Sequence, residues 1–371
     1  MSKNANNNFQ KAMLLLNAAR LPSRYMDDSI YNNPEALWVE AETLWSKLSF
    51  PPIIHQRLRK LLDVNWAEKE AERLHKYEVN FIHINDDGYP DKLRNIHNPP
   101  IGIYVRGKWG KFLERSSIGI VGTRRCSSYG RHIANSIGEA LSGAGISVVS
   151  GGALGIDAAA HIGCLNAGGV TIAVFGTGIN QIYPTKHKDL FERITENGAL
   201  VTEYPFGVQG NAWNFPERNR VIVGLSDRLV VVEAPVDSGA MISAKLALDA
   251  GIEIWSVPGQ ITDKIARGTN KLLYDGANVL ADISEFIETI GGGNQYLIPF
   301  NGENTKNTIT DDEEIILQAL SESGNKTVDD IVTKSGMSLQ QVQFCLSSLM
   351  ASKLVFLAGP GRFSAAGAGK M

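Results

Sequence analysis

Seven short apolar runs, separated by stretches of helix length, constrain the fold of this chain more than any other feature. They lie at 118–122, 146–152, 170–176, 199–203, 229–234, 252–259 and 278–282. Amphipathic segments such as 131–143 and 240–250 fill most of the intervals. Continuous apolar strands joined by helices are typical of a parallel sheet that is covered on both faces. The sequence therefore predicts an α/β fold with a doubly wound, mostly parallel sheet.

The rest of the chain divides into parts of different composition. Residues 1–85 carry apolar residues at helical spacing, Leu37 among them, and predict a helical domain. We expect the sheet-forming core at 86–290, followed by a linker at 291–310 that is rich in Gly, Asn and Thr. Three helical segments and a closing hairpin predict a winged helix at 311–371.

The loops that follow the predicted strands are rich in glycine, serine and basic residues. The sharpest example is SGGALGID at 150–157, which leads into a helix that begins near Asp157. Ligands of open parallel sheets bind at the carboxyl ends of the strands, and glycine lets backbone N–H groups approach an anion closely. One such loop alone could be a tight turn in which Asp157 caps the helix or orients the loop. Several at one edge favour an anion site.

Eight of the fourteen Lys and Arg residues between 116 and 310 fall in or just after these loops. They are Arg124, Arg125, Lys186, Lys188, Arg218, Arg220, Arg267 and Lys271. Six aromatic residues are interleaved with them: Tyr129, Tyr183, Tyr204, Phe206, Trp213 and Phe215. A cationic groove with aromatic faces is the arrangement that holds single-stranded nucleic acid. Structural roles stay open for individual residues, since Arg220 could pair with Glu217 or Glu233 and most buried aromatic residues are simply core.

The chain lacks the motifs of several common enzyme and cofactor sites. No loop matches G-x-G-x-x-G or the P-loop pattern. His161 and Cys164 have the spacing of two metal ligands, but no further ligand is near, which favours packing. Among the carboxylates at strand ends, Asp157 is better explained as a cap or an orienter of the loop and Glu233 as the partner of an arginine, whereas Glu203 stays open as an acid or base. We therefore predict no catalytic residue, no metal and no cofactor.

Cysteine usage and the N-terminus indicate the compartment. Cys126, Cys164 and Cys345 are odd in number and widely separated, so they do not suggest a disulfide framework. The first residues lack the pattern of a signal peptide, and no apolar run approaches the length of about 18 residues that spans a membrane. We expect a cytoplasmic protein without membrane contact.

Taken in order, the motifs resemble those of the DNA-processing protein A (DprA, also called Smf) family of bacteria. The resemblance extends from about Tyr89 to Ala281 and rests on GIVGTRRCSSYG, SGGALGID, FPERNR followed by GLS, SGAMISA and VPG. It implies an extended Rossmann-like core, preceded by a domain like a sterile alpha motif or a helix-hairpin-helix. The resemblance also implies that the protein is a homodimer and is not an enzyme. It implies a protein that binds and protects single-stranded DNA during natural transformation and helps to load the RecA recombinase.

The resemblance and the strand-end loops together predict the residues that contact DNA or its phosphates. They are Gly122, Arg124, Arg125, Ser150, Gly151, Gly152, Gly155, Lys186, Lys188, Phe215, Arg218, Asn219, Arg220, Ser238, Gly239 and Arg267. The chain departs from the family at His187, where many members have Asn, and its lysines flank that position.

The formal net charge of −3 is unevenly distributed. Residues 311–371 hold five Lys and Arg against seven Asp and Glu, so we expect the winged helix to mediate protein contacts or regulation more than DNA affinity.

Two alternative functions stay open. A nucleotide-binding enzyme or sensor like the phosphoribohydrolases would use the same loops, although those carry PGGxGT where this chain has SGGALGID. A transcription factor is the weaker alternative, because the wing is acidic.

Overall fold

The computed structural model describes residues 3–26, 50–63 and 65–291, and in the C-terminal part 311–321, 326–339, 354–359, 362–365 and a few positions from 341 to 349. The chain separates into two compact units, Met1–Pro299 and Phe300–Met371. Leu37 and most of the expected linker lie outside the described residues. The domain boundaries expected from the sequence stay predictions.

Among the described residues of the first unit, nine strands form one sheet in the order β1-β2-β6-β5-β4-β3-β7-β8-β9. The bounds are β1 (Asn80–His83), β2 (Gly102–Gly107), β3 (Ser117–Val121), β4 (Ser147–Ser150), β5 (Thr171–Val174), β6 (Ala199–Thr202), β7 (Arg228–Val231), β8 (Glu253–Ser256) and β9 (Asn278–Val279). Strands β3 to β9 run parallel to one another, whereas β2 is antiparallel to both β6 and β1. The mostly parallel α/β sheet is thus confirmed, with an antiparallel pair added at one edge.

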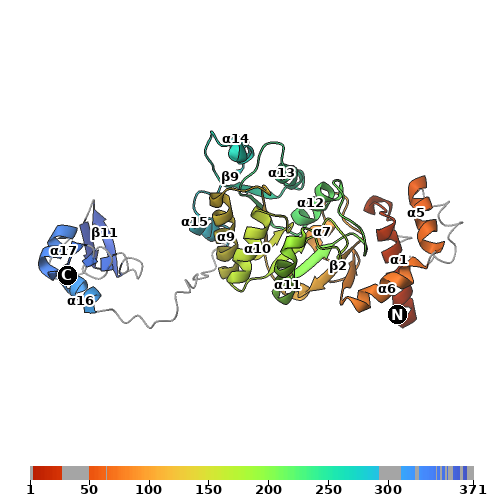
Figure 1. Cartoon of the computed structure of the whole chain (residues 1–371), viewed down its shortest axis with the longest axis horizontal. Coiled ribbons are helices and arrows are strands. Elements are labelled where there is room, and N and C mark those ends of the chain that lie inside the picture. Colours follow the sequence, from red (N-terminus) through yellow and green to blue (C-terminus); the bar gives the residue numbers. More distant parts are fainter. Residues whose placement is uncertain are drawn as a thin grey trace. The chain divides into compact units, whose positions relative to one another are not determined.

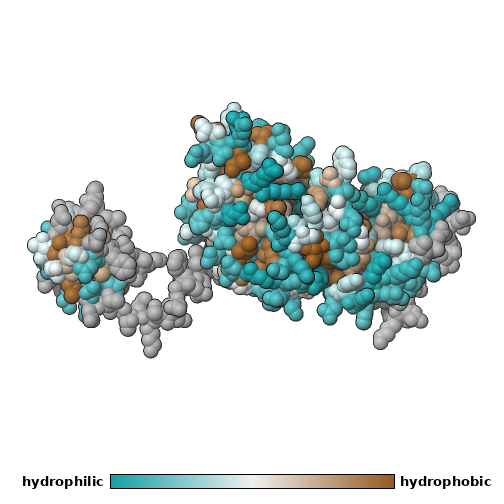
Figure 2. All heavy atoms as spheres, viewed as in Figure 1, coloured by the Kyte–Doolittle hydropathy of each residue, from teal (hydrophilic) through white to brown (hydrophobic). Residues whose placement is uncertain are grey.

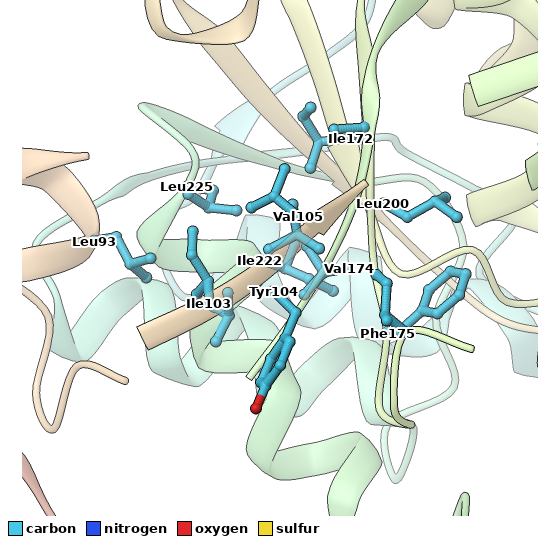
Figure 3. Close-up of a cluster of buried hydrophobic side chains, with 14 of the residues drawn as sticks. Leu93, Ile103, Tyr104, Val105, Ile172, Val174, Phe175, Leu200, Ile222 and Leu225 are labelled. Atoms are coloured by element: carbon cyan, nitrogen blue, oxygen red, sulfur yellow. The ribbon is translucent and has the colours of Figure 1, made fainter. Parts of the chain in front are cut away.

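Helices cover both faces of this sheet (Figure 1). They are α9 (Ser128–Gly143), α10 (Ile156–Asn166), α11 (Lys188–Asn197), α12 (Asn214–Gly224), α13 (Gly239–Asp249), α14 (Arg267–Tyr274) and α15 (Ile283–Ile290). Adjacent strand residues enter different core clusters, since Ile120 of β3 packs in one and Val121 in the other. Figure 3 shows part of the larger cluster, with Val105 and Ile172 on one side of the sheet and Leu200 on the other. This alternation is what a strand buried on both faces requires.

The helices α9 and α10 pack against each other at unusually short range. A Cβ at Gly163 would lie 2.0 Å from the backbone oxygen of Asn135, and one at Gly138 would lie 2.3 Å from that of Ala160. Only glycine fits at these two positions, because any side chain would collide with backbone of the facing helix. The contact therefore holds the two helices close together along their C-terminal halves.

Helices of the N-terminal region share the larger core cluster with the edge of the sheet. They are α1 (Lys3–Ala18), the short η1 (Ser23–Tyr25), α5 (Pro52–Asp63) and α6 (Trp66–Lys76), with α7 (Asp91–Arg94) and α8 (Trp109–Leu113) following. Met13 and Leu74 belong to the same cluster as Ile103 and Val105 of β2. The Asn17 amide also donates to the Glu203 carbonyl oxygen at 2.8 Å. These helices are therefore packed on the sheet as part of one core.

The second unit contains a smaller core of its own. Its described elements are α16 (Asp311–Ser321), β10 (Lys326–Thr327), α17 (Val328–Ser335), β11 (Val355–Gly359) and β12 (Arg362–Ala365). Among these, the three strands form a sheet in the order β10-β12-β11, packed near Ile316, Leu320 and Ile331. The winged-helix assignment stays a prediction.

The side of the first unit seen in Figure 2 is largely hydrophilic, with hydrophobic residues in small scattered groups. Within the part of the chain that the structure describes, no helix is both long and apolar enough to cross a membrane.

Candidate nucleic-acid interface

The carboxyl ends of the central strands open into a cleft of about 890 Å³. The loop after β3 lines it with Gly122–Arg125, and the loop after β7 lines it with Pro235, Ser238 and Gly239. Strands β3 and β7 are neighbours in the sheet although they are far apart in sequence, so the chain reverses its winding direction between them. Such a switch point is where open α/β sheets bind ligands. The cleft is therefore in the place that the fold favours for a binding site.

A cation and two aromatic rings form a row along this cleft. The guanidinium carbon of Arg124 lies 5.3 Å from the centre of the Phe215 ring, which in turn lies 5.4 Å from the centre of the Tyr183 ring. Arg124 is exposed, and Tyr183 is 51% exposed. The charge is thus available to a phosphate while the ring faces can accept stacked groups.

The glycine-rich loop at 150–157 is held from within by a carboxylate. Asp157, in the first turn of α10, accepts from the backbone N–H groups of Gly151 at 3.2 Å and Ala153 at 3.3 Å. This confirms its interpretation as the residue that orients the loop. Burial raises the pKa of Asp157, and the nearby charges of Arg218 and Arg124 oppose that shift.

Glycine is required at Gly155, the last residue of this loop before α10. Its φ is +84°, and a Cβ there would lie 2.4 Å from the Thr123 carbonyl oxygen. The backbone of the loop therefore lies directly against the segment that carries Arg124. Ser150 is buried at the end of β4, and its hydroxyl donates to the Ile120 carbonyl oxygen at 2.6 Å.

Arg218 lines the cleft, but its side chain is almost fully buried. It therefore lies at the bottom of the cleft. Its Nη1 donates to the carbonyl oxygen of Gly151 at 2.9 Å and to that of Val174. It thereby joins the ends of β4 and β5. Burial lowers the pKa of Arg218 to about 10, so the guanidinium is charged at neutral pH. A direct contact with DNA stays a prediction for this residue.

Arg220 forms an ion pair that the sequence did not indicate. Its partner is Glu203, and both side chains are mostly buried. Glu217, one of the partners expected for Arg220, pairs instead with Arg20 at 3.1 Å. Burial raises the pKa of Glu203, while the charge of Arg220 opposes the shift. The contact of Arg220 with DNA stays a prediction.

Glu233, the other expected partner of an arginine, holds the start of α9. Its carboxylate accepts from the backbone N–H of Ser127 at 2.9 Å and from the Ser127 hydroxyl. The Ser127 oxygen in turn accepts from the backbone N–H of Gly130 at 2.9 Å and caps the helix.

The two lysines of the third loop are exposed on either side of a fixed histidine. Lys186 lies in the short η2 (Thr185–His187), and Lys188 begins α11. The Nδ1–H of His187 donates to the carbonyl oxygen of Gly152 at 3.0 Å. The departure from the family pattern therefore fastens this loop to the glycine-rich one.

The remaining predicted residues divide between the cleft and its surroundings. Among them, the cleft is lined by Gly122, Arg125, Phe215, Asn219, Ser238 and Gly239. The Asn219 amide donates to the carbonyl oxygen of Gly239 at 3.3 Å and so joins α12 to α13. Gly152 lies in the buried loop, and Arg267 is exposed at the start of α14. Their contacts with DNA stay predictions.

The other residues singled out in the sequence have structural surroundings. His161 is buried with Nδ1 2.6 Å from the Thr171 hydroxyl, and Cys164 is buried beside the Val170 carbonyl oxygen. Tyr204 and Phe206 are core residues, while Trp213 is 83% exposed at the start of α12. In the described part of the chain, no group of three His, Cys, Asp or Glu side chains could hold a metal ion.

Sequence reasoning missed residues 210–212, which line the cleft ahead of α12. These residues carry neither charge nor an aromatic ring, and only their position after β6 could have indicated them.

Comparison with known proteins places residues 80–291 in the family described as DNA recombination-mediator protein A. Protein Smf of Synechocystis is 39% identical over 214 residues, which are 57% of this chain and 54% of that relative, so the chain matches about half of that relative's length. The X-ray structure of DNA processing protein A from Streptococcus pneumoniae aligns with a TM-score of 0.63 at 29% identity, over 78% of this chain and 98% of that one. A structure of the Helicobacter pylori protein, described for its single-stranded DNA binding mode, aligns with a TM-score of 0.53 at 28% identity, over 58% and 96%.

Proposed function

The chain belongs to the DNA recombination-mediator protein A family, and from that membership we propose that it binds single-stranded DNA in the strand-end cleft and acts as a recombination mediator during natural transformation. The observation that carries this proposal is the row formed by Arg124, Phe215 and Tyr183. A cation beside aromatic ring faces suits a strand whose phosphates and bases are both accessible. The similar Helicobacter pylori protein is described for binding single-stranded DNA.

The finer parts of the proposal rest on family membership. We propose that the protein protects incoming DNA, acts as a homodimer, helps RecA to assemble on the strand and is not an enzyme. Sedimentation velocity tests the dimer, and the rate of RecA assembly on an oligomer with and without this chain tests the loading role. A monomeric chain that leaves the rate of assembly unchanged would contradict both parts.

The structure gives less support to a nucleotide-binding enzyme or sensor. Glu203, the carboxylate left open as an acid or base, is buried in its pair with Arg220 and is absent from the described lining of the cleft. Release of a base from nucleoside monophosphates, abolished by Glu203→Gln, would reverse this ranking.

The cleft is tested by replacing its exposed cation. Arg124→Ala should weaken binding of all short oligomers about tenfold and reduce the slope of log affinity against log salt by about 0.7, as expected for one lost phosphate contact on a single strand. Fluorescence anisotropy over a range of salt concentrations measures both quantities.

Arg115→Ala is the matched control. Arg115 is an exposed arginine just before β3, at the opposite end of the strand from the cleft, and its Nη1 donates to the Gly145 carbonyl oxygen at 3.4 Å. Unchanged affinity and salt slope in Arg124→Ala would remove the cleft as the DNA site, whatever the rest of the chain does.

A further inference from the structure

A second cavity, of about 590 Å³, lies on the other side of the segment that carries Arg124. Residues Gly122–Arg125 line the first cleft, and Ser127 and Tyr129, only a few residues later, line the second. Consecutive residues also line the two cavities at a second place, where Ile265 lines the first and Ala266 the second. A strand bound in the cleft would therefore pass close to the entrance of this second cavity.

The lining of the second cavity is unsuited to phosphate. Its described lining contains no Lys or Arg, in contrast to the three arginines of the first cleft, and it includes the carboxylates of Glu233 and Asp263. The start of α9 would normally attract an anion, but there the Glu233 carboxylate already accepts from the Ser127 N–H. A phosphate placed here would meet like charge.

The same lining suits an aromatic, uncharged group that donates hydrogen bonds. Tyr129 is 51% exposed on the first turn of α9 and offers a ring face at the cavity wall. Gln260 adds an exposed side-chain amide, and the exposed carboxylate of Asp263, whose Oδ1 accepts from the Ile265 N–H at 3.1 Å, adds an acceptor. A flat ring with N–H groups at its edge is the chemistry that these groups would recognise.

We propose that this cavity is a nucleobase pocket, in which a base of the bound single strand stacks on Tyr129 while the phosphates lie along Arg124. This proposal rests on the proposed function and adds that two separate cavities bind different parts of the same DNA strand. The cleft binds phosphate through its cations, and the second cavity binds a base through stacking and acceptors. Binding should therefore have a component that does not depend on salt and that requires the base itself.

Oligomer binding by Tyr129→Ala tests the pocket. We expect about tenfold weaker binding of a short oligothymidine with an unchanged salt slope, since a stacked base is lost and no phosphate contact is. Tyr129→Phe keeps the ring and should retain the affinity. On the same oligomer with its bases replaced by abasic sites, the wild-type chain and Tyr129→Ala should bind equally.

Tyr274→Ala is the matched control, because Tyr274 is 90% exposed at the end of α14 and is absent from the described lining of both cavities. Wild-type affinity in Tyr129→Ala, or an equal loss on the abasic oligomer, would overturn the base pocket. A loss in Arg124→Ala with none in Tyr129→Ala would overturn the pocket alone, whereas no binding by the wild-type chain would overturn the DNA function as well.

Discussion

Replacement of Arg218 by methionine should destabilise the first unit before it affects DNA binding. The guanidinium is buried, and it donates to the carbonyl oxygens of Gly151 and Val174 at the ends of two neighbouring strands. A Cβ at Gly151 would lie 2.7 Å from both Arg218 Nη2 and Asp157 Oδ2, so these two charged groups meet on the same side of Gly151. Methionine fills a similar volume, but it leaves the carbonyl oxygens of Gly151 and Val174 without a donor and the Asp157 carboxylate without a nearby cation.

The magnitude follows from those lost partners. A buried acceptor left unsatisfied costs about 1–3 kcal/mol, so two of them reduce the free energy of unfolding by about 3 kcal/mol. For a unit of this size, about 2–4 °C per kcal/mol then predicts a fall in melting temperature of roughly 6–12 °C. Arg218→Lys keeps the charge but not the planar fork, and should fall between the wild type and Arg218→Met.

The loss should also depend on pH. Burial already raises the pKa of Asp157, and the charge of Arg218 opposes that shift. Without the arginine, the pKa of the folded-state carboxyl rises further above its unfolded value, so the ionised form becomes more destabilising. The difference in stability between Arg218→Met and the wild type should therefore grow as pH rises from the pKa of Asp157 in the wild type to its higher pKa in the variant. It should keep its largest value at higher pH and be smallest below both pKa values.

Thermal and denaturant unfolding at two pH values, together with oligomer affinity below the melting temperature, measure these effects. An unchanged melting temperature with an affinity loss of more than about tenfold would refute the reasoning. Arg218 would then act as a DNA contact and would not be needed to hold the two loops together.

Three further outcomes follow from the structure. Gly163→Ala should lower the free energy of unfolding by about 2 kcal/mol or more, because its Cβ would lie 2.0 Å from the Asn135 backbone oxygen; urea denaturation measures this, and a change below about 0.5 kcal/mol would contradict the close helix contact. Removal of residues 305–371 should leave single-strand affinity within about tenfold in anisotropy assays, since the five cations of 311–371 are outnumbered by acids. Phe215→Ala should weaken oligothymidine binding about tenfold without changing the salt slope, whereas a reduced slope would mean that the variant disturbs Arg124.

The sequence was sufficient to predict the sheet and the edge at which the candidate site lies. Each apolar run became a strand, because a strand buried on both faces leaves a continuous apolar pattern. The strand order is not written in that pattern, so the switch point between β3 and β7 had to come from the structure. For the same reason the sequence could not show that residues 210–212 reach the cleft.

Charge partners were the least predictable part of the site. Arg220 lies close to Glu217 in sequence but pairs with Glu203, because a helix and a distant strand end face each other there. Arg218 and Arg124 both follow glycine-containing loops or motifs. Arg218 is nevertheless buried, where it holds two strand ends together, whereas Arg124 is exposed. Burial depends on three-dimensional packing, and a single sequence does not distinguish a cation that holds a loop from one that faces solvent.

The shared core of the N-terminal helices and the sheet edge bears on how the protein unfolds. Met13 and Leu74 pack in the same cluster as Ile103 and Val105. If the helices detached from the sheet edge, the apolar side chains of both would therefore be exposed to water. The helices and the sheet of the first unit should therefore lose structure in one cooperative transition in calorimetry. A fragment cut at the family boundary near residue 80 would expose apolar surface along strand β2 and would be prone to aggregate. The region that matches the family, residues 80–291, is thus shorter than the part of the chain that folds as one unit, because that unit also includes the N-terminal helices.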